Sequence, residues 1–191
     1  MGAVSAHCPA VIFLTGLSGS GKSTLASGLE QRLRECGLLA TVVDGDKLRT
    51  GLCSDLGFSP ADRHENVRRA TELALHLAEV GAVVIVALIS PFHADRARAA
   101  ERAKANGIPF AEVFVNAPLA VCERRDPKHL YQRARAGEIR SFTGIDSPYE
   151  APAQPDLELH TDAESVAQSL EKLTAFALRL TSAAGSVRAD A

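Results

Sequence analysis

The amino-acid sequence predicts an α/β domain in which a parallel five-stranded sheet lies between layers of helices. Apolar runs rich in Val, Ile and Leu recur between segments of helical periodicity. They cover residues 10–15, 39–44, 82–89, 110–115 and 156–160. The runs lack the polar alternation of strands that face water on one side, so we expect them to be buried on both faces of a parallel sheet. With 191 residues, 46% of them hydrophobic, residues 1–191 are expected to form a single domain with a full core.

The first apolar run leads directly into a glycine-rich loop. Residues 16–23 read Gly-Leu-Ser-Gly-Ser-Gly-Lys-Ser, the G-x-x-x-x-G-K-[ST] pattern of a phosphate-binding loop. Glycines allow backbone conformations in which successive N–H groups converge on phosphate oxygens. In this pattern Lys22 reaches the β- and γ-phosphates, and the Ser23 hydroxyl is the protein ligand of Mg²⁺. The residues expected to bind ATP are Gly16, Leu17, Ser18, Gly19, Ser20, Gly21, Lys22, Ser23 and Thr24.

A helix is expected immediately after this loop, because Leu25, Leu29 and Leu33 repeat at helical spacing. The positive end of its dipole favours an anion at the loop. The alternative interpretation is a Gly/Ser-rich turn with a chance lysine. The position of the loop between a strand and a helix favours a phosphate site.

Two carboxylates, Asp44 and Asp46, follow the second apolar run, whereas the third run ends in Ser90-Pro91 without one. Motor and switch NTPases place the aspartate that organises Mg²⁺ at the end of a strand beside the phosphate loop. Here that task falls to the second run, at the same edge of the sheet. A carboxylate there can orient an acceptor hydroxyl, take its proton or hold a metal-bound water. The alternative is an Asp-Gly turn followed by a helix N-cap.

Two further helices have clear sequence boundaries. Ser59 is a favourable N-cap with Pro60 at the first helical position, and Gly81 is a natural stop for the apolar face between them. A last helix is expected from about residue 163 to 180, after the fifth run. The small and polar tail, 183–191, is expected to be disordered.

Residues 124–140 form a cationic segment with six Lys or Arg residues and two acidic ones, a net charge of 6 − 2 = +4. Phosphoryl transfer depends on positioning and on neutralising charge that spreads over oxygens. We therefore expect a lid that closes over the nucleotide and excludes water. The alternative is a solvated helix with exposed arginines. The expected fold is a three-layer α/β P-loop kinase fold with a parallel five-stranded sheet and a cationic lid.

Composition excludes several classes of protein. The net charge of −2 gives no broad basic surface, so nucleic acid is not an expected partner. The four cysteines are scattered without a metal-binding spacing, as in a cytoplasmic protein with reduced thiols. The longest apolar stretch, 80–89, is too short to cross a membrane, and no secretory signal is recognisable.

Two aromatic residues adjoin the segments expected to surround the phosphate site: Phe58 in the stretch from Asp44 to Asn66, and Phe142 after the cationic segment. Together they suggest a flat group in the phosphoryl acceptor, because bases stack on aromatic rings. Arg49 and Arg63 would suit a second anionic group of the acceptor. The alternative interpretation places both phenylalanines in the core.

Together these motifs resemble the adenylylsulfate kinase family, whose members phosphorylate the ribose 3'-hydroxyl of adenylylsulfate (APS) to give 3'-phosphoadenylylsulfate (PAPS) in sulfate assimilation. The resemblance extends from about residue 11 to 161. It runs through the phosphate loop, Asp44-Gly45-Asp46, and residues 55–59, 62–69, 89–91, 122–128, 134–139 and 142–150.

The resemblance implies ATP and Mg²⁺ as cofactors, APS as the acceptor and a homodimer. It implies that Phe58 and Phe142 sandwich the adenine of APS, and that Arg49, Arg63 and Asn66 hold its phosphosulfate and ribose. The implied catalytic residues are Lys22, Asp44, Asp46 and Ser90. The implied substrate-binding residues are Arg49, Phe58, Arg63, Asn66, Ile89, Ser90, Lys128, Phe142 and Thr143. In the family Ser90 is often described as a phosphoserine, but direct in-line transfer needs only both substrates in place.

The chain departs from the family pattern at three positions. Lys47 stands where an amide usually follows Asp-Gly-Asp, and Cys53 replaces another residue of the pattern. His129 stands where a glycine commonly follows the lid lysine, so lid motion is expected to differ. Two other functions stay open at this point: a P-loop kinase of another small acceptor, and a regulator that binds ATP without transferring phosphate.

Overall fold

The computed structural model describes residues 8–188 of the chain, and its centre is a sheet of five parallel strands. The strands are β1 (Ala10–Thr15), β2 (Ala40–Asp44), β3 (Val83–Ala87), β4 (Phe110–Asn116) and β5 (Leu157–His160). Their order across the sheet is β2-β3-β1-β4-β5, with every neighbouring pair parallel. The prediction of a parallel five-stranded sheet is confirmed, with each strand inside or within one residue of its predicted run.

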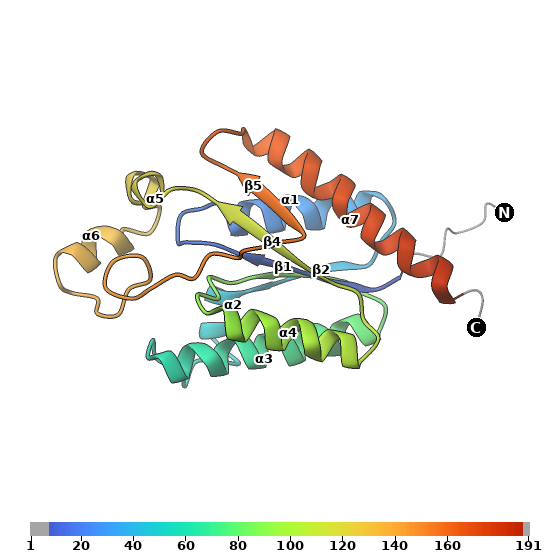
Figure 1. Ribbon diagram of the computed structural model, residues 1–191, viewed down its shortest axis with the longest axis horizontal. Coiled ribbons are helices and arrows are strands. Elements are labelled where there is room, and N and C mark those ends of the chain that lie inside the picture. The colour runs from blue at the N-terminus through green and yellow to red at the C-terminus, as the bar shows by residue number, and fades with distance from the viewer. Residues whose placement is uncertain (1–7, 189–191) are drawn as a thin grey trace.

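Helices cover both faces of this sheet (Figure 1). The helices of the described chain are α1 (Lys22–Glu35), α2 (Gly45–Arg49), α3 (Pro60–Glu79), α4 (His93–Ala105), α5 (Leu119–Arg125), α6 (Leu130–Arg135) and α7 (Val166–Arg188). α1 and α7 pack on one face, and α3 and α4 pack on the other, as predicted for a three-layer α/β fold. α5 and α6 lie beyond one end of the sheet.

Each strand contributes to two cores because successive side chains point to opposite faces. In β1, Phe13 packs with α3 and α4, whereas Ile12 and Leu14 pack with α1 and α7. All six residues of β1 are buried. This burial on both faces explains why the strands read as continuous apolar runs.

The helix boundaries follow local capping chemistry. Ser59 caps α3 in a reciprocal capping box with Asp62, and Pro60 is the first helical residue, as predicted. α7 begins at residue 166 rather than 163, because the Ser165 hydroxyl accepts from the Gln168 N–H at 3.3 Å while the Gln168 side chain accepts from the Ser165 N–H at 2.9 Å. This second capping box sets the helix start.

The C-terminal helix also ends later than the sequence predicted. α7 extends to Arg188, so the structure gives a helical backbone to residues 183–188, where we expected a disordered tail. Consecutive alanines at 183 and 184 favour helix over coil. Residues 189–191 lie outside the described part of the chain. No helix within residues 8–188 is long and apolar enough to span a bilayer.

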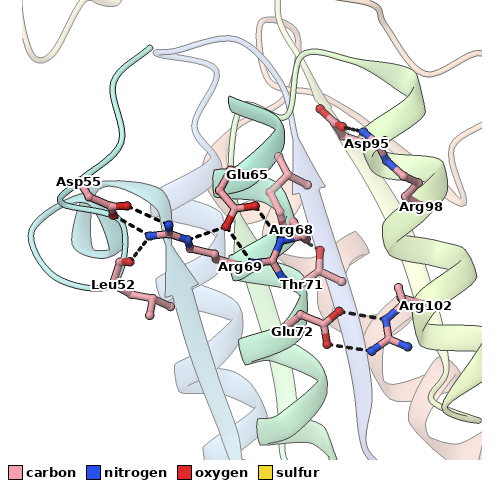
Figure 2. Close-up of polar contacts among 11 residues, drawn as sticks. Leu52, Asp55, Glu65, Arg68, Arg69, Thr71, Glu72, Asp95, Arg98 and Arg102 are labelled. Atoms are coloured by element: carbon pink, nitrogen blue, oxygen red, sulfur yellow. Dashed lines mark hydrogen bonds and ion pairs between the residues drawn. The ribbon is translucent and has the colours of Figure 1, made fainter. Parts of the chain in front are cut away.

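Ion pairs on the outer face of α3 tie neighbouring segments to it (Figure 2). Arg69 donates to both carboxylate oxygens of Asp55, at 2.6 and 2.8 Å, and to the carbonyl of Leu52 at 2.9 Å. Arg102 of α4 donates to both carboxylate oxygens of Glu72 at 2.9 and 3.0 Å. The loop between α2 and α3 is thereby fixed to α3, and α4 is fixed beside it.

Candidate active site

A cavity of about 840 Å³ opens where the strands end and the phosphate loop begins. Every predicted site residue lines it except Gly16 and Leu17. The predicted lining residues are Ser18, Gly19, Ser20, Gly21, Lys22, Ser23, Thr24, Asp44, Asp46, Arg49, Phe58, Arg63, Asn66, Ile89, Ser90, Lys128, Phe142 and Thr143. Residues from distant parts of the sequence thus meet in one cavity at the edge where parallel α/β sheets bind ligands.

The phosphate loop depends on its glycines for shape. Gly16, Gly19 and Gly21 all have positive φ, at 151°, 77° and 106°. A Cβ on Gly16 would lie 2.4 Å from the Val115 carbonyl oxygen, so no other residue fits there without moving β4. Gly21 is the N-cap of α1, and the first residues of this helix line the cavity, so its free first-turn N–H groups are available to an anion there.

Lys22 is buried and folds back on the loop. Its ammonium group donates to the carbonyls of Gly16 and Leu17 at 2.9 and 2.8 Å, so these two residues contact Lys22 although they do not line the cavity. Burial lowers the pKa of Lys22 to about 8. Because burial disfavours the charged form of Lys22, a phosphate bound beside it would stabilise that form.

The two carboxylates after β2 reach different partners. The Ser23 hydroxyl donates to Asp44 Oδ2 at 2.9 Å, which connects Asp44 to the phosphate loop. Asp44 Oδ1 also accepts from the Asp46 N–H at 2.9 Å and caps α2, so the N-cap interpretation is confirmed, while the functional role of Asp44 stays a prediction. Asp46 forms an ion pair with Lys128. One carboxylate thus faces the phosphate loop, and the other faces the lid.

Two arginines and Phe58 form another part of the cavity wall. Arg49 donates to the Gly57 carbonyl at 2.8 Å, and its guanidinium carbon lies 4.2 Å from the centre of the Phe58 ring. Arg63 donates to the Phe58 carbonyl at 2.9 Å and to Thr143. Burial lowers the pKa of both guanidinium groups, and neither forms an ion pair with a carboxylate within residues 8–188. This part of the cavity suits an anion.

The two phenylalanines differ in burial. Phe58 is 56% exposed, whereas Phe142 is 8% exposed. The Phe142 ring packs edge to face on the Tyr131 ring, with 5.0 Å between the ring centroids. Phe142 therefore belongs to the small core beneath α5 and α6, yet it still lines the cavity. The sandwich of an adenine between these two rings stays a prediction.

Three buried polar atoms in the described part of the chain have no hydrogen-bond partner: Ser20 Oγ, Asn66 Nδ2 and Ser90 Oγ. All three residues line this cavity. Buried polar groups in native proteins are almost always hydrogen-bonded, so clustered exceptions point to groups that a ligand would satisfy.

The cationic segment extends along the cavity beside the phosphate loop. Arg125, Lys128, Arg133 and Arg140 line the cavity, whereas Arg124 and Arg135 do not. The Tyr131 hydroxyl donates to the Ser18 carbonyl at 2.9 Å, which fastens α6 to the phosphate loop. The position of this segment agrees with the predicted lid.

Sequence reasoning included Arg125 in the cationic segment but missed the part of the cavity wall beside it, at the start of the segment after β5. Thr161 donates to the Ser20 carbonyl at 2.7 Å, and Arg125 donates to the Thr161 hydroxyl at 3.2 Å. Glu164, Val166 and Ser169 complete this wall. The signal was present, because Thr161 directly follows the fifth run at the ligand-binding edge of the sheet.

Comparisons with known proteins agree with this geometry. The model of the family described as adenylylsulphate kinase matches residues 8–160. An adenylyl-sulfate kinase of Geotalea daltonii is 51% identical over 170 residues, which are 89% of this chain and 83% of the relative. The adenylyl-sulfate kinase of Escherichia coli O6:K15:H31 is 54% identical over 164 residues, 86% of this chain and 80% of the relative.

Solved structures give the same result. The Mycobacterium tuberculosis APS kinase CysC, in complex with AMPPNP and APS, is 50% identical with a TM-score of 0.86. The match covers 89% of this chain and 98% of that one. A gluconokinase from Sinorhizobium meliloti is only 19% identical with a TM-score of 0.58, so it shares the fold alone. The chain belongs to the adenylylsulphate kinase family.

Proposed function

We propose that this chain transfers the γ-phosphoryl group of ATP to the ribose 3'-hydroxyl of APS, which gives PAPS. The observation that carries the proposal is a single cavity lined both by the phosphate loop and by an aromatic, cationic set of residues, Arg49, Phe58 and Arg63. Asp44 and Asp46 line the same cavity. Catalysis then consists mainly of alignment and charge neutralisation, since the protein has little covalent work to do in phosphoryl transfer.

In the nucleotide part of the cavity, the loop N–H groups and Lys22 would hold the phosphates of ATP. The Lys22 ammonium group leaves the Gly16 and Leu17 carbonyls and moves to the phosphates. Tyr131 and Arg125 keep the lid segment against the loop, at the Ser18 and Gly19 carbonyls. Water is thereby kept from the γ-phosphate.

The residues beside the phosphate loop fit Mg²⁺. A hydroxyl and a carboxylate, Ser23 Oγ and Asp44 Oδ2, lie 2.9 Å apart, and hard oxygen donors are the ligands that Mg²⁺ prefers. Residues 8–188 contain no cluster of three or more His, Cys, Asp or Glu, which agrees with an ion that takes its other ligands from phosphates and water. Ser23 would ligate the ion, and Asp44 would hold a water bound to it. When bound, Mg²⁺ neutralises charge on the transferred phosphoryl group.

In the acceptor part of the cavity, Phe58 and Phe142 would hold the adenine, and Arg49 and Arg63 the phosphosulfate. The unpartnered Asn66 amide supplies a donor to the sugar or phosphate. Asp46 would accept a hydrogen bond from the 3'-hydroxyl and orient it toward the γ-phosphorus. Lys128, now paired with Asp46, would contact the phosphoryl group in transit.

The proposal is tested by incubating the purified protein with ATP, Mg²⁺ and a panel of acceptors. We expect ADP release and PAPS formation with APS, and neither with gluconate, nucleosides or sugars. Turnover of another acceptor in preference to APS would favour the alternative kinase. Binding of ATP without ADP release under any of these conditions would favour a regulator.

Two features of its cellular setting belong to the same proposal. We propose a homodimer, the assembly implied by the family resemblance, and light scattering of the purified protein measures its mass. We also propose a cytoplasmic location, which agrees with four free cysteines at positions 8, 36, 53 and 122. Fractionation of cells that express the tagged chain tests this location.

A further inference from the structure

Ser90 adopts a backbone conformation that its own sequence disfavours. Its φ is +43°, in the left-handed region that residues with a Cβ rarely occupy. The following residue is Pro91, which also disfavours helical backbone angles at the position before it. Such a conformation persists only where the surrounding structure holds it. The side chain of Ser90 is buried, lines the active cavity and has an unpartnered hydroxyl oxygen.

A buried arginine holds this turn from outside the cavity. Arg96, in the first turns of α4, is 2% exposed and does not line the active cavity. Its Nη1 donates to the Ser90 carbonyl at 2.7 Å, and its Nη2 donates to the Glu150 carbonyl at 2.7 Å. Its Nε donates to the Glu112 carboxylate on β4. One guanidinium group therefore joins the turn after β3, a strand of the sheet and the segment that follows the lid.

Further bonds join the same two segments. Tyr149 shares a hydrogen bond of 2.9 Å with Thr15, and the Thr15 hydroxyl donates to the Ile89 carbonyl at 2.7 Å. The Glu150 N–H donates to the Pro91 carbonyl at 2.8 Å. The segment up to residue 150 begins with Phe142 and Thr143, which line the cavity. The Ser90 side of the pocket and the Phe142 side are thus connected behind the cavity wall.

We propose that Arg96 is a positioning residue of the acceptor pocket, which sets the distance between Ser90 and the segment carrying Phe142 and Thr143. The inference rests on the proposed acceptor site, because it gives those residues their role. Arg96 acts through the two carbonyls and touches neither substrate. A guanidinium group suits this task since its planar fork fixes several acceptors at once, which a lysine ammonium does not reproduce.

The test compares Arg96→Lys with Arg102→Lys. Arg102 lies on the same helix and also binds a carboxylate through two nitrogens, but its partner Glu72 is on the outer face of α3 (Figure 2). We expect Arg96→Lys to raise the KM for APS about tenfold while the KM for ATP changes less than about twofold. Arg102→Lys leaves both KM values unchanged. A parallel change of both KM values in Arg96→Lys, or no change, would overturn the inference.

Glu112→Gln is the second variant, because Arg96→Lys removes buried donors and its folding needs to be checked by circular dichroism. It retains Arg96 and loosens its anchor on the side away from the cavity. We expect the ratio of the KM for APS to the KM for ATP to rise, by less than in Arg96→Lys. An unchanged ratio in Glu112→Gln would overturn the positioning role of Arg96 even if Arg96→Lys does not fold. Phe58→Ala separates the two proposals. An unchanged KM for APS in Phe58→Ala overturns the acceptor site and this inference together. If the KM for APS rises in Phe58→Ala but is unchanged in Arg96→Lys, only the role of Arg96 is overturned.

Discussion

Truncation of Phe58 to alanine is expected to weaken APS binding without unfolding the protein. The ring is 56% exposed and lies against Arg49 rather than in the core, so its loss should change the free energy of unfolding by about 0.5 kcal/mol or less. Stacking of a base on an aromatic ring contributes about 1–3 kcal/mol. At about 1.4 kcal/mol per tenfold change, the dissociation constant for APS should rise roughly 5- to 140-fold.

Isothermal titration calorimetry with APS and, separately, with a nonhydrolysable ATP analogue measures both affinities. The analogue should bind Phe58→Ala as it binds the parent chain, because the Phe58 ring lies against Arg49 and Phe58 is not part of the phosphate loop. Leu52→Ala is the matched control: Leu52 is an apolar residue in the same loop, 51% exposed, and does not line the cavity. Equal APS affinity in Phe58→Ala, Leu52→Ala and the parent would refute the aromatic acceptor pocket.

Three further predictions concern the nucleotide part of the cavity and the lid. Burial lowers the pKa of Lys22 to about 8, and bound phosphates favour its charged form. Between about pH 8 and the ordinary pKa of 10.5, ATP binding should therefore be accompanied by proton uptake, and the affinity for ATP should fall as the pH rises through this window. Calorimetric enthalpies that do not depend on the ionisation enthalpy of the buffer near pH 9 would contradict it. Asp44→Asn retains an oxygen that can cap α2 but removes the charge beside Ser23. Its kcat should therefore fall at least about 100-fold, and it should need more Mg²⁺. Kinetics over a series of Mg²⁺ concentrations that match the parent would disprove the role of Asp44 at the metal site. His129 has a φ of +53°, a backbone conformation in which glycine is unstrained. His129→Gly should therefore raise the free energy of unfolding, measured by urea denaturation, by up to about 1 kcal/mol. A decrease would show that the His129 side chain stabilises the lid.

Sequence reasoning predicted the features that depend on local pattern. The strands are evident because burial on both faces makes each run apolar throughout, and α3 is evident because Ser59, Pro60 and Gly81 mark its ends. The phosphate loop, the Asp44 turn and the Ser90 turn could be placed because each follows a strand, and the carboxyl ends of parallel strands share one edge. Asp44 and Ser23 meet for this reason although they are far apart in sequence.

Features that depend on three-dimensional packing were not predicted. The start of α7 depends on a capping box between Ser165 and Gln168, whose residues alone do not distinguish a cap from a turn. Arg96 reads as one of many arginines in an exposed helix. Its burial and its two carbonyl partners appear only once Ser90 and the Glu150 segment are brought to the same end of α4.

A single-turnover experiment with γ-labelled ATP tests the central claim most directly. The enzyme, Mg²⁺, labelled ATP and excess APS are mixed, quenched over milliseconds to seconds, and separated into protein, nucleotide and inorganic phosphate. We predict that label passes from ATP to the 3'-oxygen of APS in one kinetic phase, with none accumulating on the protein. Label that appears on Ser90 at a rate matching turnover, or as inorganic phosphate in place of PAPS, would contradict direct transfer in this cavity.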